Sequence, residues 1–136
     1  MATLTEAAAT VGLSNLCYLM PGAVLAEEVF FRGAMQPAFA YGYPMLGLAV
    51  ASVAFGFAHF LPPRREFWMY PVMASIAGAV FGLCYWVTGG NLIAAFTAHL
   101  TVNLLNLRLM RDQVAELARE MQAPHGLSGP PAPPEL

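Results

Sequence analysis

The residues most able to do chemistry in this sequence are polar or charged side chains that interrupt long apolar stretches. They comprise carboxylates, imidazoles, a guanidinium and amides, namely Glu27, Glu28, Arg32, His59, His99, Asn103 and Asn106. A charge at the centre of a membrane helix costs roughly 2.5–3.5 kcal/mol, so such residues are candidates for a functional site. For any one of them, the alternative is a buried ion pair or an interhelical hydrogen bond that only orients the helices.

These residue types suit the hydrolysis of an amide. A carboxylate in an apolar site can take a proton from water near neutral pH, and a neutral imidazole can hold that water or protonate the leaving amine. A second imidazole together with an amide can donate hydrogen bonds to the oxyanion of the tetrahedral intermediate. Glu27, His59 and His99 could instead bind Zn²⁺. The sequence has no His-Glu-x-x-His motif, but zinc stays open on these grounds.

The spacing of the polar residues predicts which of them share a helix face. Glu28 and Arg32 are four residues apart, so they can pair. Glu27 is turned about 100° from Glu28 and is free for another role. His99 and Asn103 are also four apart, and Asn106 continues their face.

The positions of these residues along the predicted helices place them at similar depths in the membrane. Glu27 precedes a turn near Tyr43 by as many residues as His59 follows it, so the two lie at the same level of a helical hairpin. His99 falls near the middle of a later helix. We therefore expect a carboxylate, two imidazoles and an amide to face a shared cavity, with the Glu28–Arg32 pair as a buttress.

The amino-acid composition indicates whether these helices lie in a membrane or in water. The hydrophobic fraction is 58%, the charged fraction 10% and the formal net charge −2, whereas about 25% of the residues in soluble domains are charged. No basic face exists that could bind a nucleic acid. Cys17 and Cys84 lie inside apolar runs and are interpreted as free thiols. The chain is predicted to be an integral membrane protein.

The predicted fold is all-α, a multi-pass transmembrane bundle of about four spanning helices. A hydrocarbon core about 30 Å thick needs about 20 mostly apolar residues per helix. An apolar stretch over 7–40 is expected to break at Pro21, and Gly89 and Gly90 are expected to form a turn before a cap at Asn91. The expected spanning helices are 22–39, 43–61, 67–88 and 91–110.

Three regions are predicted along the chain. Residues 1–110 form the transmembrane core, 111–123 an amphipathic helix at the membrane surface, and 124–136 a Pro/Gly-rich disordered tail. No basic segment precedes the first apolar stretch, so a removable signal peptide is not expected. The positive-inside rule would place two loop regions on the cytoplasmic side, those that carry Arg64, Arg65, Arg108 and Arg111.

Three short motifs, in this order, resemble those of the CAAX-processing and bacteriocin-processing (CPBP) family of intramembrane proteases. Glu27, Glu28 and Arg32 match Glu-Glu-x-x-x-Arg, and Gly33 follows them. Residues 55–59 match Phe-x-x-x-His, and residues 99–103 match His-x-x-x-Asn. The resemblance covers about residues 21–108. Members of the family usually carry further helices ahead of the first motif.

The resemblance implies a membrane endopeptidase that cuts near the C-terminus of CAAX-like, lipidated or sorting-signal proteins. By motif position it implies Glu27 as the water-activating base with His59, and His99 with Asn103 as the oxyanion site. Glu28 and Arg32 would support Glu27. Family members are often labelled metalloproteases, yet the mechanism favoured here requires no metal.

The resemblance also indicates the partners and location. Membrane lipid and a membrane-anchored protein or peptide substrate are the expected partners, and the oligomeric state is left open. The expected location is a bacterial inner membrane. Two other functions are considered: a non-catalytic immunity or scaffolding protein, and a small transporter or channel subunit with Glu27 and Glu28 in an ion path.

Overall fold

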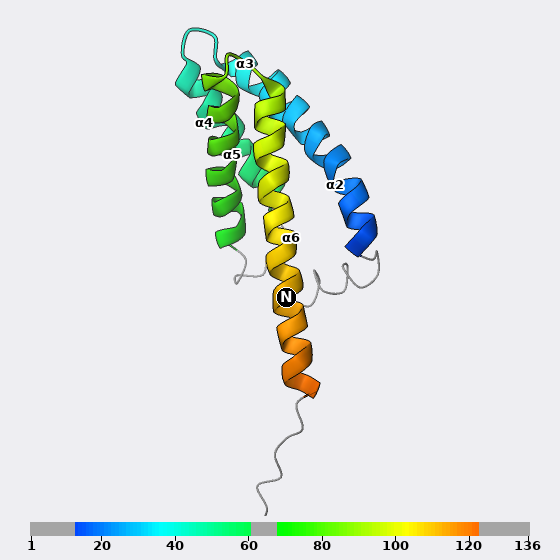
Figure 1. Ribbon diagram of the computed structural model, residues 1–136. Helices are drawn as coiled ribbons and strands as arrows, with labels where there is room; N and C mark the ends of the chain where they lie inside the picture. The colour runs from blue at the N-terminus through cyan, green and yellow to red at the C-terminus, as the bar shows by residue number, and fades with distance from the viewer. Residues whose placement is uncertain (1–12, 61–67, 123–136) are drawn as a thin grey trace, which may run out of the picture. The chain divides into compact units, whose positions relative to one another are not determined.

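The computed structural model of this chain describes residues 13–60 and 68–122. All regular structure within these ranges is helical and no strand occurs there, which confirms the all-α prediction. The elements in chain order are α2 (Leu13–Glu28), η1 (Val29–Met35), α3 (Gln36–Phe39), α4 (Pro44–Ala58), α5 (Met69–Val87) and α6 (Leu92–Gln122) (Figure 1).

Proline 21 does not break the first helix, so the predicted interruption is wrong. Pro21 lies inside α2, which has 16 residues and continues to Glu28. A proline removes one backbone donor, but the neighbouring peptide groups of an apolar segment have no better partners than their helical ones. The helix therefore continues through Pro21.

A π-helix replaces the α-helix expected after the two glutamates. Residues Val29–Met35 form η1, and the backbone N–H of Gln36 donates to the carbonyl of Phe31, five residues earlier. π-Helical turns are rare and occur frequently at functional sites. The expected helix 22–39 is thus divided among α2, η1 and α3, and Arg32 lies inside the widened turn.

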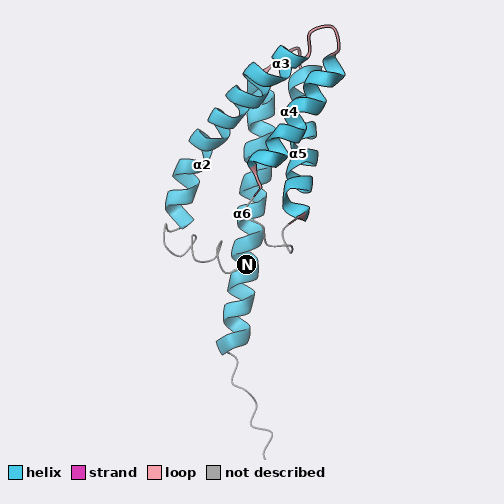
Figure 2. Ribbon diagram, turned by 180° about the vertical axis from the view of Figure 1, so that it is seen from behind, coloured by secondary structure: helices cyan, strands magenta, loops and turns pink. Residues whose placement is uncertain are grey.

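Helix α4 is shorter than predicted. It has 15 residues, begins at Pro44 after Tyr43 and ends at Ala58, so that His59 is its C-cap. Helix α4 packs along α5, and within this part of the chain the beginning of α6 lies beside α5 (Figure 1 and Figure 2). Gly56 allows the approach of α4 to α5, because a Cβ there would overlap the hydroxyl of Ser75.

The turn between α5 and α6 agrees with the sequence prediction. Gly89 and Gly90 have φ values of 73° and 87°, a backbone region that residues with a Cβ rarely adopt. The side chain of Asn91 accepts a hydrogen bond of 3.0 Å from the backbone N–H of Ile93 and caps α6.

Helix α6 runs without a break from Leu92 to Gln122, so within the described residues the helices expected for 91–110 and 111–123 are a single element. By residue contacts, the chain forms one compact unit that ends at Asn103 and another that begins at Leu104. All elements from α2 to the first turns of α6 belong to the first unit. The second unit comprises the later part of α6, whose side chains are mostly exposed.

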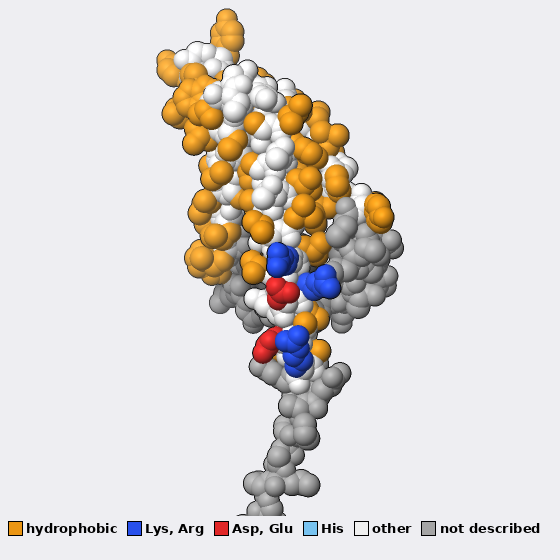
Figure 3. Space-filling view, in the orientation of Figure 1, with side chains coloured by type: hydrophobic (Ala, Val, Ile, Leu, Met, Phe, Trp, Pro, Cys, Tyr) orange, Lys and Arg blue, Asp and Glu red, His pale blue; other side chains and the backbone are white. Residues whose placement is uncertain are grey.

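The first unit buries polar as well as apolar side chains and exposes many large apolar ones. Among its described residues, the buried polar side chains are those of Glu28, Arg32, Gln36, Ser52 and His99. Large exposed side chains include Tyr18, Leu19, Val53, Phe57, Ile76 and Ile93. On the face drawn in Figure 3, hydrophobic side chains cover these helices, and the visible charges gather along the later part of α6. This distribution is expected for helices in contact with lipid.

Within residues 13–60 and 68–122, two helices are long and apolar enough, by length and composition, to cross a membrane. They are Met69–Val87 and Leu92–Arg119, while the apolar helix Pro44–Ala58 is shorter. The prediction of about four spanning helices is therefore met only for two of them, because α4 ends early and the segment before it is divided into three elements.

Several predictions concern residues outside the described ranges. They are the start of the first apolar stretch before Leu13, the loop with Arg64 and Arg65, and the tail 124–136. Cys84 is a free, half-buried thiol, as predicted.

Candidate active site

The end of α2 gives its two adjacent glutamates different surroundings. The side chain of Glu28 is completely buried, whereas that of Glu27 is 35% exposed. Adjacent helical residues differ in direction by about 100°, which accounts for the difference. Glu27 is thus the carboxylate that a substrate or water can reach.

Arg32 is a fully buried cation, and the predicted pair with Glu28 is present. Its Nη1 donates to Glu28 Oε1 at 3.0 Å, and its Nη2 donates to the backbone carbonyl of Gly78 at 2.8 Å. The guanidinium carbon also lies 4.7 Å and 5.5 Å from the ring centroids of Phe55 and Phe81. A carboxylate, a carbonyl and aromatic faces therefore replace the water lost on burial.

His99 contacts both glutamates through its two ring nitrogens. Its Nδ1 lies 2.7 Å from Glu28 Oε1, the oxygen that also accepts the Arg32 hydrogen bond. We therefore assign Nδ1–H as the donor and the carboxylate as the acceptor. Its Nε2 lies 3.7 Å from Glu27 Oε2. The Glu28–Arg32 pair thus contacts His99, a connection that the sequence did not predict.

His59 is held by the end of α4. Its backbone N–H donates to the carbonyl of Gly56, three residues earlier, at 3.1 Å. The carbonyl of Phe55, four residues earlier, is therefore left for another donor. The ring Nδ1 of His59 fills this role at 2.8 Å. A carbonyl can only accept, so Nδ1 carries the hydrogen and Nε2 of the neutral ring is free. The bond accounts for the four-residue spacing, and the contact between the Phe55 and His59 rings, whose centroids are 4.4 Å apart, accounts for the phenylalanine.

Glu27 Oε2 lies between the two imidazoles. Its distance is 4.0 Å to His59 Nε2 and 3.7 Å to His99 Nε2. Both distances exceed a direct hydrogen bond and are ones that a single water can bridge. The structure therefore brings together Glu27, His59 and His99, as their depths in the predicted helices led us to expect.

The two asparagines differ in their placement. Asn103 is half-buried and lies one helical turn after His99, and its amide makes no hydrogen bond with another described residue. Asn106 is exposed and belongs to the second unit. The role predicted for Asn103 in oxyanion binding stays a prediction.

The cluster was also compared with a metal site. Imidazole nitrogens and a carboxylate oxygen are donors that Zn²⁺ takes. Within residues 13–60 and 68–122, however, no group of three or more His, Cys, Asp or Glu side chains is arranged to hold an ion. That no metal is required stays a prediction, and the chemistry below is derived from the side chains alone.

Gln36 and Phe81 adjoin the cluster and were missed by the sequence analysis. Gln36 is 5% exposed and its Nε2 donates to the carbonyl of Gly82 at 3.0 Å. Phe81 is 1% exposed and stacks on the ring of His99. Two features of the sequence could have indicated them. Gln36 is an amide in an apolar run, four residues after Arg32, and Gly78 and Gly82 have the Gly-x-x-x-Gly spacing that is typical of close helix packing.

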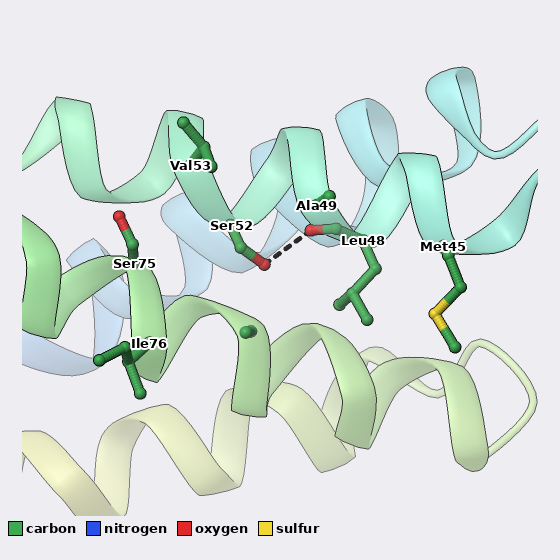
Figure 4. Close-up of a pocket in the computed structure, with 8 residues that line it drawn as sticks. Met45, Leu48, Ala49, Ser52, Val53, Ser75 and Ile76 are labelled. Atoms are coloured by element: carbon green, nitrogen blue, oxygen red, sulfur yellow. Dashed lines mark hydrogen bonds between the residues drawn. The ribbon is translucent and has the colours of Figure 1, made fainter.

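A separate hollow of about 420 Å³ lies between α4 and α5, and no predicted site residue lines it (Figure 4). Its wall is apolar, with Leu48, Val53 and Ile76 among the lining residues. The hydroxyls of Ser52 and Ser75 donate to carbonyls of their own helices, at 2.6 Å and 2.9 Å. The hollow therefore offers no polar group for chemistry.

The chain was compared with known proteins. The model of the family described as type II CAAX prenyl endopeptidase, Rce1-like, matches residues 9–105, which include all six predicted catalytic residues. The same comparisons found no match among curated proteins or solved structures.

Proposed function

The chain belongs to the Rce1-like family of type II CAAX prenyl endopeptidases, which are membrane proteases, and we propose that it hydrolyses a peptide bond through a water activated by Glu27. The observation that carries this proposal is the position of Glu27 Oε2, which faces Nε2 of both His59 and His99. The neighbouring side chains of Glu28 and Arg32 are fully buried.

In the proposed reaction, a water lies between the Glu27 carboxylate and His59 Nε2. Glu27 takes a proton from this water as its oxygen attacks the carbonyl carbon of the scissile bond. The proton then passes to the leaving nitrogen, directly or through His59, as the C–N bond breaks. The products are a new carboxyl terminus and a free amine.

His99 and Asn103 are proposed to stabilise the oxyanion of the intermediate. With Nδ1–H given to Glu28, a second proton on Nε2 makes His99 an imidazolium, and the Glu28 carboxylate at 2.7 Å is the counter-charge for that form. The Nε2–H then faces the reacting centre. The Asn103 amide, one turn further along α6, supplies a second donor.

The proposed substrate is the C-terminal tail of a lipidated or otherwise membrane-anchored protein, or of a sorting-signal protein. This assignment rests on the family, whose description names prenyl endopeptidases, and on the apolar outer surface of the helices. A bacterial inner membrane as the location stays a prediction of the sequence.

The proposal is tested by Glu27→Gln in the purified, membrane-inserted protein. We expect cleavage of a lipidated C-terminal peptide to be abolished, while the yield in the membrane and the thermal stability remain those of the parent. Glu116→Gln is the matched control, because Glu116 is exposed and its ion pair among the described residues is with Arg119, which is exposed as well. Comparison of membrane proteomes with and without the active protein would identify natural substrates by their new C-termini. Full cleavage by Glu27→Gln would refute the proposed chemistry.

A further inference from the structure

Helix α5 is attached to the preceding segment through two of its backbone carbonyls. Arg32 Nη2 donates to Gly78 at 2.8 Å, and Gln36 Nε2 donates to Gly82 at 3.0 Å. The donors are four residues apart, as are the acceptors, and all the atoms are buried. These bonds therefore fix the rotation of α5 about its axis as well as its distance from η1 and α3.

Glycines allow this attachment. A Cβ on Gly82 would lie 2.7 Å from Gln36 Oε1 and 2.6 Å from Leu48 Cδ1, and one on Gly78 would lie 3.1 Å from Phe55 Cδ1. A side chain at Gly82 would therefore displace the Gln36 amide and the Leu48 side chain, and one at Gly78 would crowd the Phe55 ring.

Phe81 lies between the two anchored carbonyls and covers one face of the His99 ring. The two ring centroids are 4.5 Å apart and the planes differ by 16°. The edge of the same imidazole meets Phe55, at 5.4 Å and 78°. The hydrogen bond from Nδ1 to Glu28 leaves the ring free to turn about that bond, and the flat contact with Phe81 removes this freedom.

We propose that Phe81 is a positioning residue for His99, and that Gln36 acts through Phe81 by anchoring α5 at Gly82. Phe81 itself is buried, so its role is to act through the His99 ring. It holds the imidazole plane so that Nε2 points toward Glu27 Oε2, 3.7 Å away. The expected effect on kcat rests on the proposed function, whereas the orientation of the His99 ring by Phe81 does not depend on it.

The kinetic test compares Phe81→Leu with Phe31→Leu, per folded molecule. Phe31 is a buried phenylalanine of the same core, and its ring packs on Phe55 and Phe30. We expect Phe81→Leu to lower kcat by about 10–10²-fold with KM little changed, because a displacement of about 1 Å in a catalytic group can cost about 10²-fold. Phe31→Leu should retain the parent kcat, and Phe81→Tyr, which keeps a flat ring, should recover most of it. If Phe81→Leu yields too little folded protein, Phe81→Met replaces it.

The contribution of Gln36 is tested in a double-mutant cycle. Gln36→Leu should lower kcat in the same direction as Phe81→Leu. The variant with both changes should be no slower than Phe81→Leu alone, because both act through one contact. Losses that multiply would overturn the assignment of Gln36.

A spectroscopic measurement separates this inference from the proposed function. In protein labelled at the histidine rings, the stacked Phe81 shifts the His99 ring protons upfield. Phe81→Leu should remove that shift and leave the His59 signals in place, whether or not a substrate is cleaved. An unchanged His99 signal, a parent-like kcat in Phe81→Leu, or an equal loss in Phe31→Leu would each overturn the positioning role.

Discussion

Replacing Arg32 with alanine removes the cation on which the buried Glu28 carboxylate depends. In the structure, Arg32 donates to Glu28 and to the carbonyl of Gly78. After the change, Glu28 retains only the contact with His99, and its Oε2 already lacks a hydrogen-bond partner among the described residues. The carboxylate then lies in an apolar interior with the His99 ring as its remaining partner.

The magnitude follows from that loss. Removing one partner of a buried ion pair costs about 3–5 kcal/mol. The second bond to Gly78 and the aromatic contacts of the guanidinium place Arg32→Ala in the upper part of this range. The ratio of folded to unfolded protein should thus fall by about 10³–10⁴-fold, at 1.36 kcal/mol per factor of ten. Arg32→Lys keeps the charge but has no planar fork to bridge both acceptors, so its loss should be smaller but measurable.

The assay is equilibrium unfolding in mixed micelles with increasing fractions of denaturing detergent. A double-mutant cycle with Glu28→Gln and Arg32→Met isolates the interaction between the two side chains. We expect the double variant to be far less destabilised than the sum of the single ones. Parent stability in Arg32→Ala, or additive losses in the cycle, would show that the pair does not stabilise the fold as argued.

Three further outcomes are expected. Cleavage should survive EDTA or 1,10-phenanthroline, and activity lost to chelation and restored specifically by Zn²⁺ would make Glu27, His59 and His99 ligands instead. Asn103→Ala should lower kcat by about 10²–10³-fold at a nearly constant KM, as for the loss of an oxyanion donor. Leu104→Ala and Leu105→Ala should not do so, and a raised KM at constant kcat would make Asn103 a substrate-binding residue. Gly82→Ala should lower thermal stability, because its methyl group meets Gln36 and Leu48, and an unchanged melting temperature would argue against the close approach.

Local spacing and hairpin depth predicted much of the site. The Glu28–Arg32 contact follows from an i,i+4 separation in a helix, and it survives the change to a π-helical turn because the two side chains still lie on one face. The approach of Glu27 to His59 follows from their equal distances to the turn, although α4 ends earlier than expected. Both predictions use only the rise and the twist of a helix.

Other features depend on tertiary contacts that spacing does not encode. No residue type marks the backbone hydrogen bonds of η1, and nothing local indicates that α2 tolerates Pro21. The choice of His99 as the second partner of Glu28 is a matter of side-chain orientation between distant helices. Gln36 and Phe81 were missed for the same reason, since their importance comes from Gly82 and His99 on other elements.

The glycine turn between α5 and α6 constrains chain length as well as backbone conformation. Phe81 precedes Gly90 by as many residues as His99 follows it, so the turn sets the two rings opposite each other. An insertion or deletion between them would rotate one ring by about 100° and separate the stacked pair. Insertions after Asn103 carry no such penalty. Length variation among homologous chains should accordingly be absent from 81–99 and permitted beyond 103.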